Sequence, residues 1–381
     1  MARAVFVQRC ARDTPLPART HSARAGLLHK GGGNRSKWPV TRSMSLALYI
    51  LRRLLSVVPT LFGVTLISFF LTYLLPGNPA LVKAGPLATP EYVAEVERRM
   101  GLDRPMWEQY GRYVSGLFRG DLGESASTGR PVLEDFLQRL PATLELTLAS
   151  LILAVAIGVP LGVLAAVHRD TWVDHLGRII GVAGVAMPTF WTGLLFIYVL
   201  FYMVGLAPAP LGRLAPDLSP PAHLTGLYVV DAALSGNWRV LGSSLAQLAL
   251  PAATLAFSVM APLARMARAT MLEILQSDYI TAAWAAGLPR RRVVYGDALR
   301  NALIPIVTTL GVIFGFLMAG NAVVETVFAW PGIGNYAVTA LMTKDSGPIQ
   351  SFVLFVAVMY VSVNLAVDLI YALVDPRIRL G

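Results

Sequence analysis

Six long apolar runs, separated by polar segments, dominate the pattern of hydrophobic and polar positions along the chain. Each exceeds the roughly 20 apolar residues that a helix needs to cross a bilayer. Six runs of this length cannot all be buried core helices in a chain of 381 residues. The pattern therefore predicts an all-α polytopic membrane protein with six transmembrane helices. The predicted spans are residues 54–75, 146–167, 179–204, 240–264, 301–324 and 346–367.

The overall composition agrees with a membrane protein. Hydrophobic residues make up 55% of the chain and charged residues 14%, whereas a soluble domain carries about 25% charged residues. The single cysteine, Cys10, excludes a disulfide within one chain.

The formal net charge of +10 is concentrated near the N-terminus. Residues 1–43 hold nine Lys or Arg and one acidic residue, so the remaining chain carries about +2. This distribution argues against a nucleic-acid-binding face. The basic, Gly- and Pro-containing composition predicts a disordered extension, followed by a membrane domain at 44–381. Met44 would make a natural start, which gives the hypothesis that residues 1–43 are dispensable; finding Met1 or Ala2 at the native N-terminus by mass spectrometry would refute it.

Basic residues at the span ends predict the topology. Arg52 and Arg53 precede the first span, residues 290–292 lie between the fourth and fifth, and Arg377 follows the last. Because Lys and Arg near span ends favour the cytoplasm, we expect both termini and a loop at 273–302 to be cytoplasmic. The segments 76–141 and 205–239 would then be external.

The external segment 76–141 contains helix signals. Thr89 suits an N-cap, Pro90 a first helical position and Gly101 a helix stop. A second helix is predicted over 105–118. These helices would form either a vestibule over the membrane or a structural cap without ligand contacts.

Catalytic and nucleotide-binding motifs are missing from the sequence. None of the four lysines follows a glycine, so the chain has no phosphate-binding P-loop. It has no HExxH or GxSxG motif, and we predict no bound cofactor or metal. If the protein moves a solute uphill, another chain must supply the energy.

The stretch "DYITAAWAAGLPRRRVVYGDALRNALIPIV", residues 278–307, is too long and patterned for a simple connection. Asp278 can cap a short helix that Gly287 ends. A second helix, 290–301, would follow and lead into the fifth span. The first helix would carry one low-profile face, formed at i, i+3, i+4, i+7 spacing by Tyr279, Ala282, Ala283 and Ala286.

Trp284 lies on this short helix without an adjacent apolar run to bury it. Exposed aromatic residues mark protein interfaces, but Trp is also favoured where a helix lies against a membrane surface. Both interpretations stay open from the residues alone.

This stretch resembles the EAA loop of ABC importer permeases, whose short coupling helix docks in a groove of the ATPase subunit. Thr281, Ala282 and Ala283 fall where the motif has Glu-Ala-Ala, and Gly287 occupies the motif's glycine. Other segments resemble the dipeptide/oligopeptide/nickel branch, and the resemblance covers about 45–381. They include "LLPGNPA" (74–80), "GDLGES" (120–125), "LPATLELTLA" (140–149), "VVETVFAWPGIG" (323–334) and "NLAVDLIYALVDPRIRLG" (364–381).

The chain also departs from the pattern of this family. Arg300 stands where the generic motif has proline, and Pro305 follows eighteen residues after the glycine, as in the branch. Pro289 replaces a usual serine. Thr281, Trp284 and Ala286 stand where the branch carries basic residues, which leaves open which charged pairs would hold an ATPase.

The resemblance implies a type I ABC importer permease of the bacterial inner membrane, a subunit without catalysis of its own. Its implied partners are a second homologous permease, two ABC ATPase subunits, a periplasmic or lipid-anchored substrate-binding protein, membrane lipid and a di- or oligopeptide substrate. Nickel chelates, glutathione and haem are alternative substrates. The implied ATPase-coupling residues are Asp278, Tyr279, Thr281, Ala282, Ala283, Trp284, Ala286 and Gly287. The implied lever comprises Arg290, Arg291, Arg292, Arg300 and Pro305.

A second group of candidates lies at the predicted outer end of the fifth span. Glu325 either lines the translocation path or holds the following turn by hydrogen bonds, together with Trp330, Pro331 and Gly332 as part of an external gate.

A proton-coupled secondary transporter is the rival from a different class. It predicts a relay of buried acids or paired broken helices in inverted halves, and the sequence shows neither. A membrane enzyme is a weaker third hypothesis, because no catalytic constellation is present.

Overall fold

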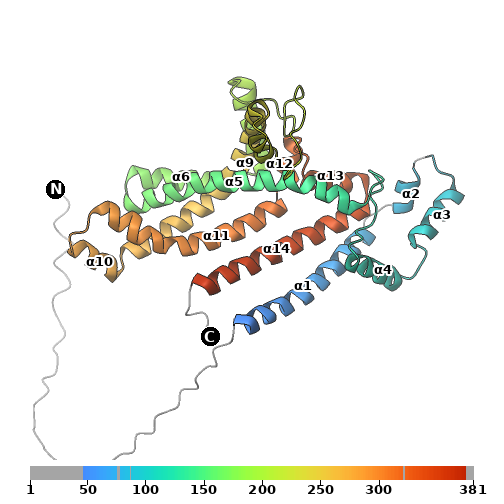
Figure 1. The fold of residues 1–381 in the computed structure, drawn as a ribbon, viewed down its shortest axis with the longest axis horizontal. Helices are drawn as coiled ribbons and strands as arrows, with labels where there is room; N and C mark the ends of the chain where they lie inside the picture. Colours follow the sequence, from blue (N-terminus) through green and yellow to red (C-terminus); the bar gives the residue numbers. More distant parts are fainter. Residues whose placement is uncertain (1–45, 75–77, 86, 321, 375–381) are drawn as a thin grey trace, which may run out of the picture. The chain divides into compact units, whose positions relative to one another are not determined.

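The computed structural model describes residues 46–74, 78–85, 87–320 and 322–374, without the side chains of 46–54, 74, 320 and 368–374. The predicted extension at 1–43 lies outside the described residues. Within the described ranges the regular elements are helices, and the only strand-like pairing is a single bridge between Glu124 and Pro131 (Figure 1). The all-α prediction is confirmed.

Five helices of the described chain are long and apolar enough to cross a membrane. They correspond to the first, second, fourth, fifth and sixth predicted spans, although the fifth ends at Gly320 and not at the predicted residue 324. The fifth is continuous, because its π-helical part, η2, runs directly into an α-helix. The five are α1 (Leu46–Leu74), α5 (Val132–Val167), α9 (Trp238–Leu275), η2 (Arg292–Ala298) with α11 (Leu299–Gly320), and α14 (Ser346–Val374).

The third predicted span, 179–204, is wrong as a single straight helix. The segment instead forms α6 (Trp172–Ala186) and then α7 (Thr189–Phe196) with η1 (Ile197–Met203), bent by 107°. Pro188 causes the break, because it lacks an N–H and disfavours helical backbone at the preceding residue. Met187 is accordingly extended, with φ −90° and ψ 125°. The described chain therefore has five spans, or six if this bent pair crosses as one.

The centre of the helical assembly is the packing of α9 against α5 and α6. Small residues allow the backbones to approach closely, as is common between helices in membranes. A Cβ on Gly158 would lie 3.1 Å from the Met260 carbonyl oxygen, and one on Gly184 would lie 2.7 Å from that of Phe257. The glycines thus set how close these helices lie.

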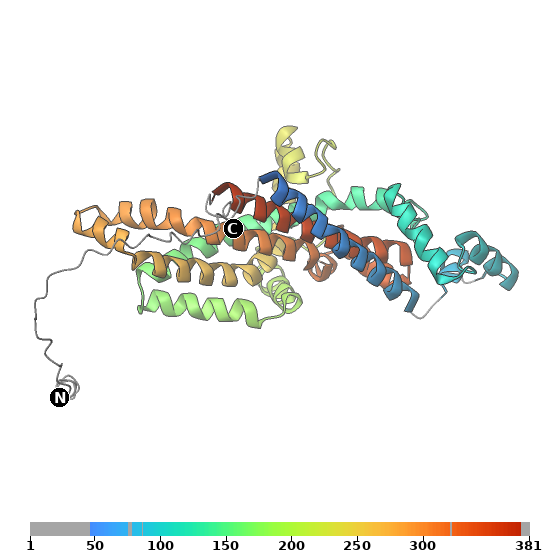
Figure 2. The same ribbon diagram turned by 90° about the horizontal axis from the view of Figure 1, so that it is seen from below.

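Helix α1 contacts this assembly mainly through α14, the last helix. Figures 1 and 2 show α1, in blue, beside α14, in red, and the two helices are in contact. The Thr72 hydroxyl accepts a 2.5 Å hydrogen bond from the Gln350 amide, and the Ser68 hydroxyl donates to the Gln350 carbonyl at 3.2 Å.

The segment after α1 folds much as its helix signals predict. It forms α2 (Pro79–Ala84), α3 (Pro90–Met100) and α4 (Met106–Phe118). The Thr89 hydroxyl accepts the N–H of Tyr92, and Gly101 ends α3 in the left-handed conformation at φ +72°. Helix α5 already begins at Val132, so the last ten residues of the predicted loop at 76–141 belong to a helix.

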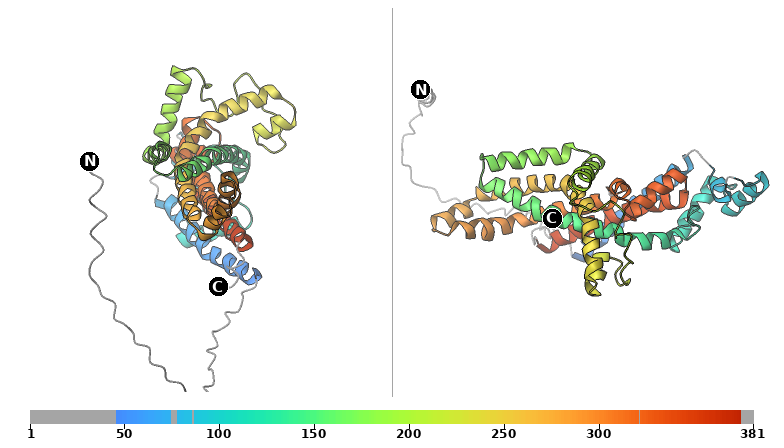
Figure 3. Two further views of the ribbon diagram at one scale, coloured as in Figure 1. Left: turned by 90° about the vertical axis from the view of Figure 1, so that its left-hand side faces the viewer. Right: turned by 90° about the horizontal axis from the view of Figure 1, so that it is seen from above.

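Three further short helices, α8 (Tyr228–Leu234), α12 (Ala322–Val327) and α13 (Ile333–Thr343), lie between the later spans. Figure 3 shows α8 and the start of α9, in yellow, standing out to one side of the other helices. After α11, the chain forms α12, a tight turn and α13.

Candidate functional site

The predicted coupling helix is present as α10 (Asp278–Ala285), between α9 and the helix that begins at Arg290. The sequence predicted that Asp278 caps this helix, and that prediction is wrong. Ser277 holds the N-cap position in extended backbone, and Asp278 is the first helical residue. The carboxylate of Asp278 still favours the helix start, because the helix dipole is positive there.

Burial divides α10 into two faces. Ile280 is fully buried and Ala283 partly buried, and both belong to the hydrophobic cluster formed with α9 and η2. By helical spacing the opposite face carries Asp278, Ala282 and Ala285, which are exposed. The low-profile face predicted at 279, 282, 283 and 286 is thus only partly right, because Ala283 packs against its own chain.

The remaining predicted coupling residues lie at the margins of the exposed face. Tyr279, Thr281 and Ala286 are exposed, and Trp284 is 42% exposed, so its own chain covers the tryptophan only in part. Gly287 ends the helix at φ +75°, a conformation that side-chain-bearing residues adopt only under strain. The Leu288 N–H returns to the Ala283 carbonyl at 3.2 Å and closes the turn.

The predicted lever forms one helix with the fifth span. Helical backbone runs from Arg290 through η2 into α11, without interruption. Val293, Val294 and Ala298 face inward and are buried. The lever arginines are exposed, and Pro305, inside α11, is half-buried.

One hydrogen bond ties the coupling helix to this lever. The Asn301 side-chain amide donates to the Tyr279 hydroxyl at 2.9 Å and to the Asp297 carbonyl at 3.0 Å. With Ile280 anchored in the cluster beneath it, α10 is held to the start of α11 by both apolar packing and a polar contact.

At the opposite end of α11, Glu325 holds the turn that follows α12. Its fully buried carboxylate accepts hydrogen bonds from the Thr143 hydroxyl at 2.6 Å and from the Asn335 N–H at 2.8 Å. Burial raises the pKa of the Glu325 carboxyl, and these hydrogen bonds act against that rise. Of the two roles foreseen for Glu325, this geometry fits the turn-holding one.

The other predicted gate residues surround this carboxylate. The Trp330 indole is buried and donates to the Ala142 carbonyl at 2.8 Å. Gly332 is buried where any Cβ would collide with the Glu325 carboxylate, and Pro331 is exposed. The turn between α12 and α13 is therefore fastened to α5.

Two family models match almost the whole of the described chain. The description "Binding-prot-dependent transport system membrane comp, N-term" covers residues 46–147, and "Binding-protein-dependent transport system inner membrane component" covers 158–380. The chain belongs to this family. It is a multi-pass inner-membrane permease subunit of an ABC importer, as the sequence resemblance predicted.

Curated relatives match this permease over most of their length. The probable D,D-dipeptide transport system permease protein DdpB of Escherichia coli (strain K12) is 47% identical over 319 residues, which are 84% of this chain and 94% of the relative. The dipeptide transport system permease protein DppB of Alkalihalophilus pseudofirmus is 43% identical, over 87% of this chain and 99% of the relative. A solved structure of the MetNI methionine ABC transporter in inward-facing conformations has a TM-score of 0.47 and 19% identity, covering 63% of this chain and 96% of that chain.

Sequence reasoning missed one buried ion pair of the permease. Glu145 immediately precedes the second predicted span, and its partner Arg213 lies 68 residues later in the Pro-rich loop. Arg213 is 7% and Glu145 6% exposed, and the closest nitrogen–oxygen distance is 2.6 Å. Arg213 also donates to the Gly226 carbonyl and stacks over the Tyr228 ring at 3.6 Å. No local pattern links these positions, so only the fold could reveal the pair.

Two buried aspartates fasten the loop before α5. Asp135 accepts the Thr128 and Tyr336 hydroxyls at 2.6 and 2.9 Å. Asp345 accepts the Ser125 hydroxyl and the Ser127 N–H. Burial raises the pKa of the Tyr336 hydroxyl to about 12, and the Asp135 carboxylate acts in the same direction. Within the described ranges, no three His, Cys, Asp or Glu side chains gather as a metal site would require.

Proposed function

We propose that this permease forms half of the membrane pathway of an importer for dipeptides and short oligopeptides. The substrate class rests on the curated relatives, of which those at 42–47% identity are named for the transport of dipeptides, D,D-dipeptides or di- and tripeptides. A permease named for glutathione transport is 37% identical over 87% of this chain. Glutathione is itself a peptide and is the second candidate; nickel chelates and haem are further alternatives.

The observation that carries the coupling mechanism is the two-sided geometry of α10. Its outer face, formed by Asp278, Ala282 and Ala285, presents small side chains that another protein can approach closely. Its inner face is anchored in the hydrophobic cluster. A force applied to the outer face would therefore be passed to the chain's own helices rather than lost in a loose loop.

In this proposal a separate ATPase subunit takes hold of α10 from the cytoplasm. Movement of α10 would be carried through the Tyr279–Asn301 hydrogen bond into the helix from Arg290 to Gly320. That helix ends next to the turn held by Glu325, so the two ends of the pathway would move together. ATP would be hydrolysed in the partner, and this chain would remain without catalysis.

The proposed assembly has two permeases, two ATPases and an external binding protein that delivers the substrate. Basic residues at the span ends favour cytoplasmic termini. Segments 76–141 and 205–239 would then face the binding protein, and α10 would face the ATPase.

Uptake by the reconstituted complex tests the substrate and the energy source. Membrane vesicles holding this chain with its partner subunits are expected to take up labelled dialanine when ATP and the binding protein are present. Unlabelled dipeptides should compete better than glutathione, a nickel chelate or haem. Uptake driven by a proton gradient in vesicles without ATP would contradict the importer mechanism.

Co-purification of the ATPase tests the docking face separately. Ala282→Trp places a bulky side chain on the outer face of α10 and should reduce the ATPase recovered with the permease by about tenfold or more. Ala233→Trp, at an exposed alanine of α8, is the matched control and should leave recovery unchanged. Equal recovery with both variants would show that the ATPase docks elsewhere.

A further inference from the structure

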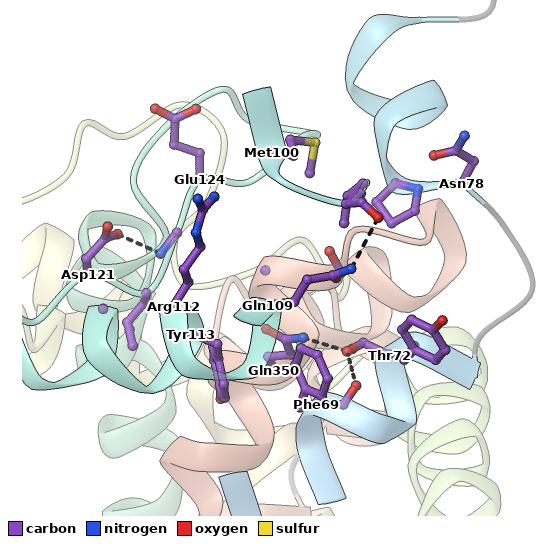
Figure 4. Close-up of a pocket in the computed structure, with 18 residues that line it drawn as sticks. Phe69, Thr72, Asn78, Met100, Gln109, Arg112, Tyr113, Asp121, Glu124 and Gln350 are labelled. Atoms are coloured by element: carbon purple, nitrogen blue, oxygen red, sulfur yellow. Dashed lines mark hydrogen bonds between the residues drawn. The ribbon is translucent and has the colours of Figure 1, made fainter. Parts of the chain in front are cut away.

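A pocket of about 590 Å³ lies at the far end of the spans from α10. Its walls are the last turns of α1, the first residues of α14, and the loop helices α3 and α4 (Figure 4). Phe69 and Tyr73 come from the outer part of the candidate span Leu55–Tyr73, and Gln350 from the first turns of α14. The pocket therefore lies where two spans leave the membrane.

The pocket carries one cationic and one anionic side chain without charged partners. The Arg112 guanidinium makes no hydrogen bond or ion pair within the part of the chain that the structure describes, and it lies over Gly101, where a Cβ would stand only 2.5 Å from it. Asp121 accepts the Gly123 N–H at 2.8 Å and has no basic group within 4 Å among the described residues. Glu124, in contrast, is paired with Lys83 at 2.8 Å.

The wall between these charges and the membrane is aromatic. Phe69 stacks with Tyr73 and Tyr113, at ring-centroid distances of 6.5 and 6.2 Å. The Tyr113 hydroxyl is buried beside Ser68, so a ligand in the pocket would meet the tyrosine ring and not this oxygen.

Exposed aromatics on α4 place this region at a membrane boundary. Trp107 and Phe118 are 75% and 88% exposed, and Tyr73 at the end of α1 is 55% exposed. Aromatic rings are enriched at the headgroup level of bilayers. A ligand in the pocket could therefore keep an apolar part in the membrane.

We propose that this pocket binds the headgroup of a phosphatidylethanolamine lipid. Guanidinium groups bind phosphate with charge-assisted hydrogen bonds, so Arg112 would hold the phosphate. Asp121 would accept a hydrogen bond from the primary ammonium group. The acyl chains would run along the aromatic wall and the exposed surface of α1.

Native mass spectrometry of the full-length, delipidated permease tests this site. The protein is offered phosphatidylethanolamine, phosphatidylcholine and phosphatidylglycerol with the same acyl chains, one at a time. We expect one phosphatidylethanolamine to be retained, with at least about tenfold weaker retention of the other two. Phosphatidylcholine cannot donate an N–H to Asp121, and phosphatidylglycerol has no ammonium; losing a hydrogen bond to a charged group weakens binding by about this factor.

Two variants separate the contributions, and a third is the control. Arg112→Ala should weaken the retention of phosphatidylethanolamine and of phosphatidylcholine alike, and Asp121→Asn should remove the preference between the two lipids. Arg104→Ala removes an exposed arginine paired with Glu108 and should bind like the wild type.

Three results would overturn the proposal. The first is equal retention of phosphatidylethanolamine and phosphatidylcholine by the wild type, and the second is unchanged retention in Arg112→Ala. The third is displacement of the lipid by dialanine with the same dependence on Arg112, since the occupant would then be a peptide.

Discussion

At the scale of single residues, buried charges of this permease pair elements that are far apart in the chain. Arg213 brings a guanidinium against Glu145 on α5, beside the Tyr228 ring. Asp174 on α6 is also fully buried, and its two carboxylate oxygens accept hydrogen bonds from the Arg268 guanidinium on α9 at 2.7 and 2.9 Å. A buried charge that loses its partner is strongly destabilising, so such pairs fix one arrangement of the elements they join.

Arg213→Ala is expected to lower the free energy of unfolding by about 3–5 kcal/mol, because Glu145 would remain buried without its partner. Thermal unfolding of the purified permease in detergent measures the effect. Arg239→Ala is the control, since its pair with Asp217 is exposed and should contribute at most about 1 kcal/mol. Similar melting temperatures for the two variants would mean that the Arg213 pair is not a structural anchor.

Asp231 gives a residue-scale prediction for pH. Burial disfavours its charged form, but the side-chain hydroxyl of Thr225 and the N–H groups of Thr225, Gly226 and Leu224 outweigh this and lower its pKa. A carboxyl whose pKa is lower in the folded than in the unfolded state stabilises the fold above its unfolded pKa of about 3.9. That stabilisation is lost as the pH falls through the folded pKa.

The difference in melting temperature between the wild type and Asp231→Asn should therefore be largest near pH ~7 and shrink steadily below pH ~4. Asp217→Asn removes an exposed carboxylate from the same loop and should show no such pH-dependent difference. A difference for Asp231→Asn that is constant with pH would exclude the ionised hydrogen-bond acceptor as its cause.

At the scale of elements, glycine positions decide how α6 packs on α9. Gly184 faces the Phe257 carbonyl oxygen, which a Cβ would approach to 2.7 Å, whereas a Cβ on Gly181 of the same helix would meet nothing within 4 Å. The sequence alone does not distinguish the two, because both lie within an apolar helix three residues apart.

Gly184→Ala should destabilise the permease by about 1–3 kcal/mol, as overpacking of a close contact does. Gly181→Ala should be neutral or slightly stabilising, because alanine is the better helix former by up to about 1 kcal/mol. The two variants are compared by thermal unfolding in the same detergent. Equal destabilisation would argue against the close packing of α6 on α9.

At the scale of the whole molecule, one helix connects the proposed docking site to the turn at the other end of the spans. It runs from Arg290 to Gly320, starts beside Tyr279 on α10 and is followed by the turn that Glu325 holds. Coupling through such an element requires that α10 stay attached to it.

Asn301→Ala removes the hydrogen bond to Tyr279 while leaving the outer face of α10 intact. We expect normal co-purification of the ATPase, together with dialanine uptake lowered several-fold. Thr308→Ala is a suitable control, since that hydroxyl bonds only within α11, to the Ile304 carbonyl. Unchanged uptake in Asn301→Ala would show that movement of α10 reaches α11 by another route.

The sequence by itself determined the features that depend on neighbouring residues. Apolar runs long enough for a bilayer marked five of the spans, Thr89 and Gly101 marked the ends of α3, and Gly287 marked the end of α10. Each of these signals acts over a few residues, through burial of apolar side chains or through allowed backbone angles, so it can be recognised without the fold.

The tertiary structure decided what depends on residues far apart in the chain. It turned Ala283 of α10 inward, paired Glu145 with Arg213, and joined Arg112, Asp121 and Phe69 in one pocket. It also showed that the helix breaks at Pro188 with a 107° bend, whereas the prolines inside α5, α9 and α11 leave those helices continuous. Hydropathy records how much apolar surface a segment carries; which side of it meets another helix is fixed only when the helices pack.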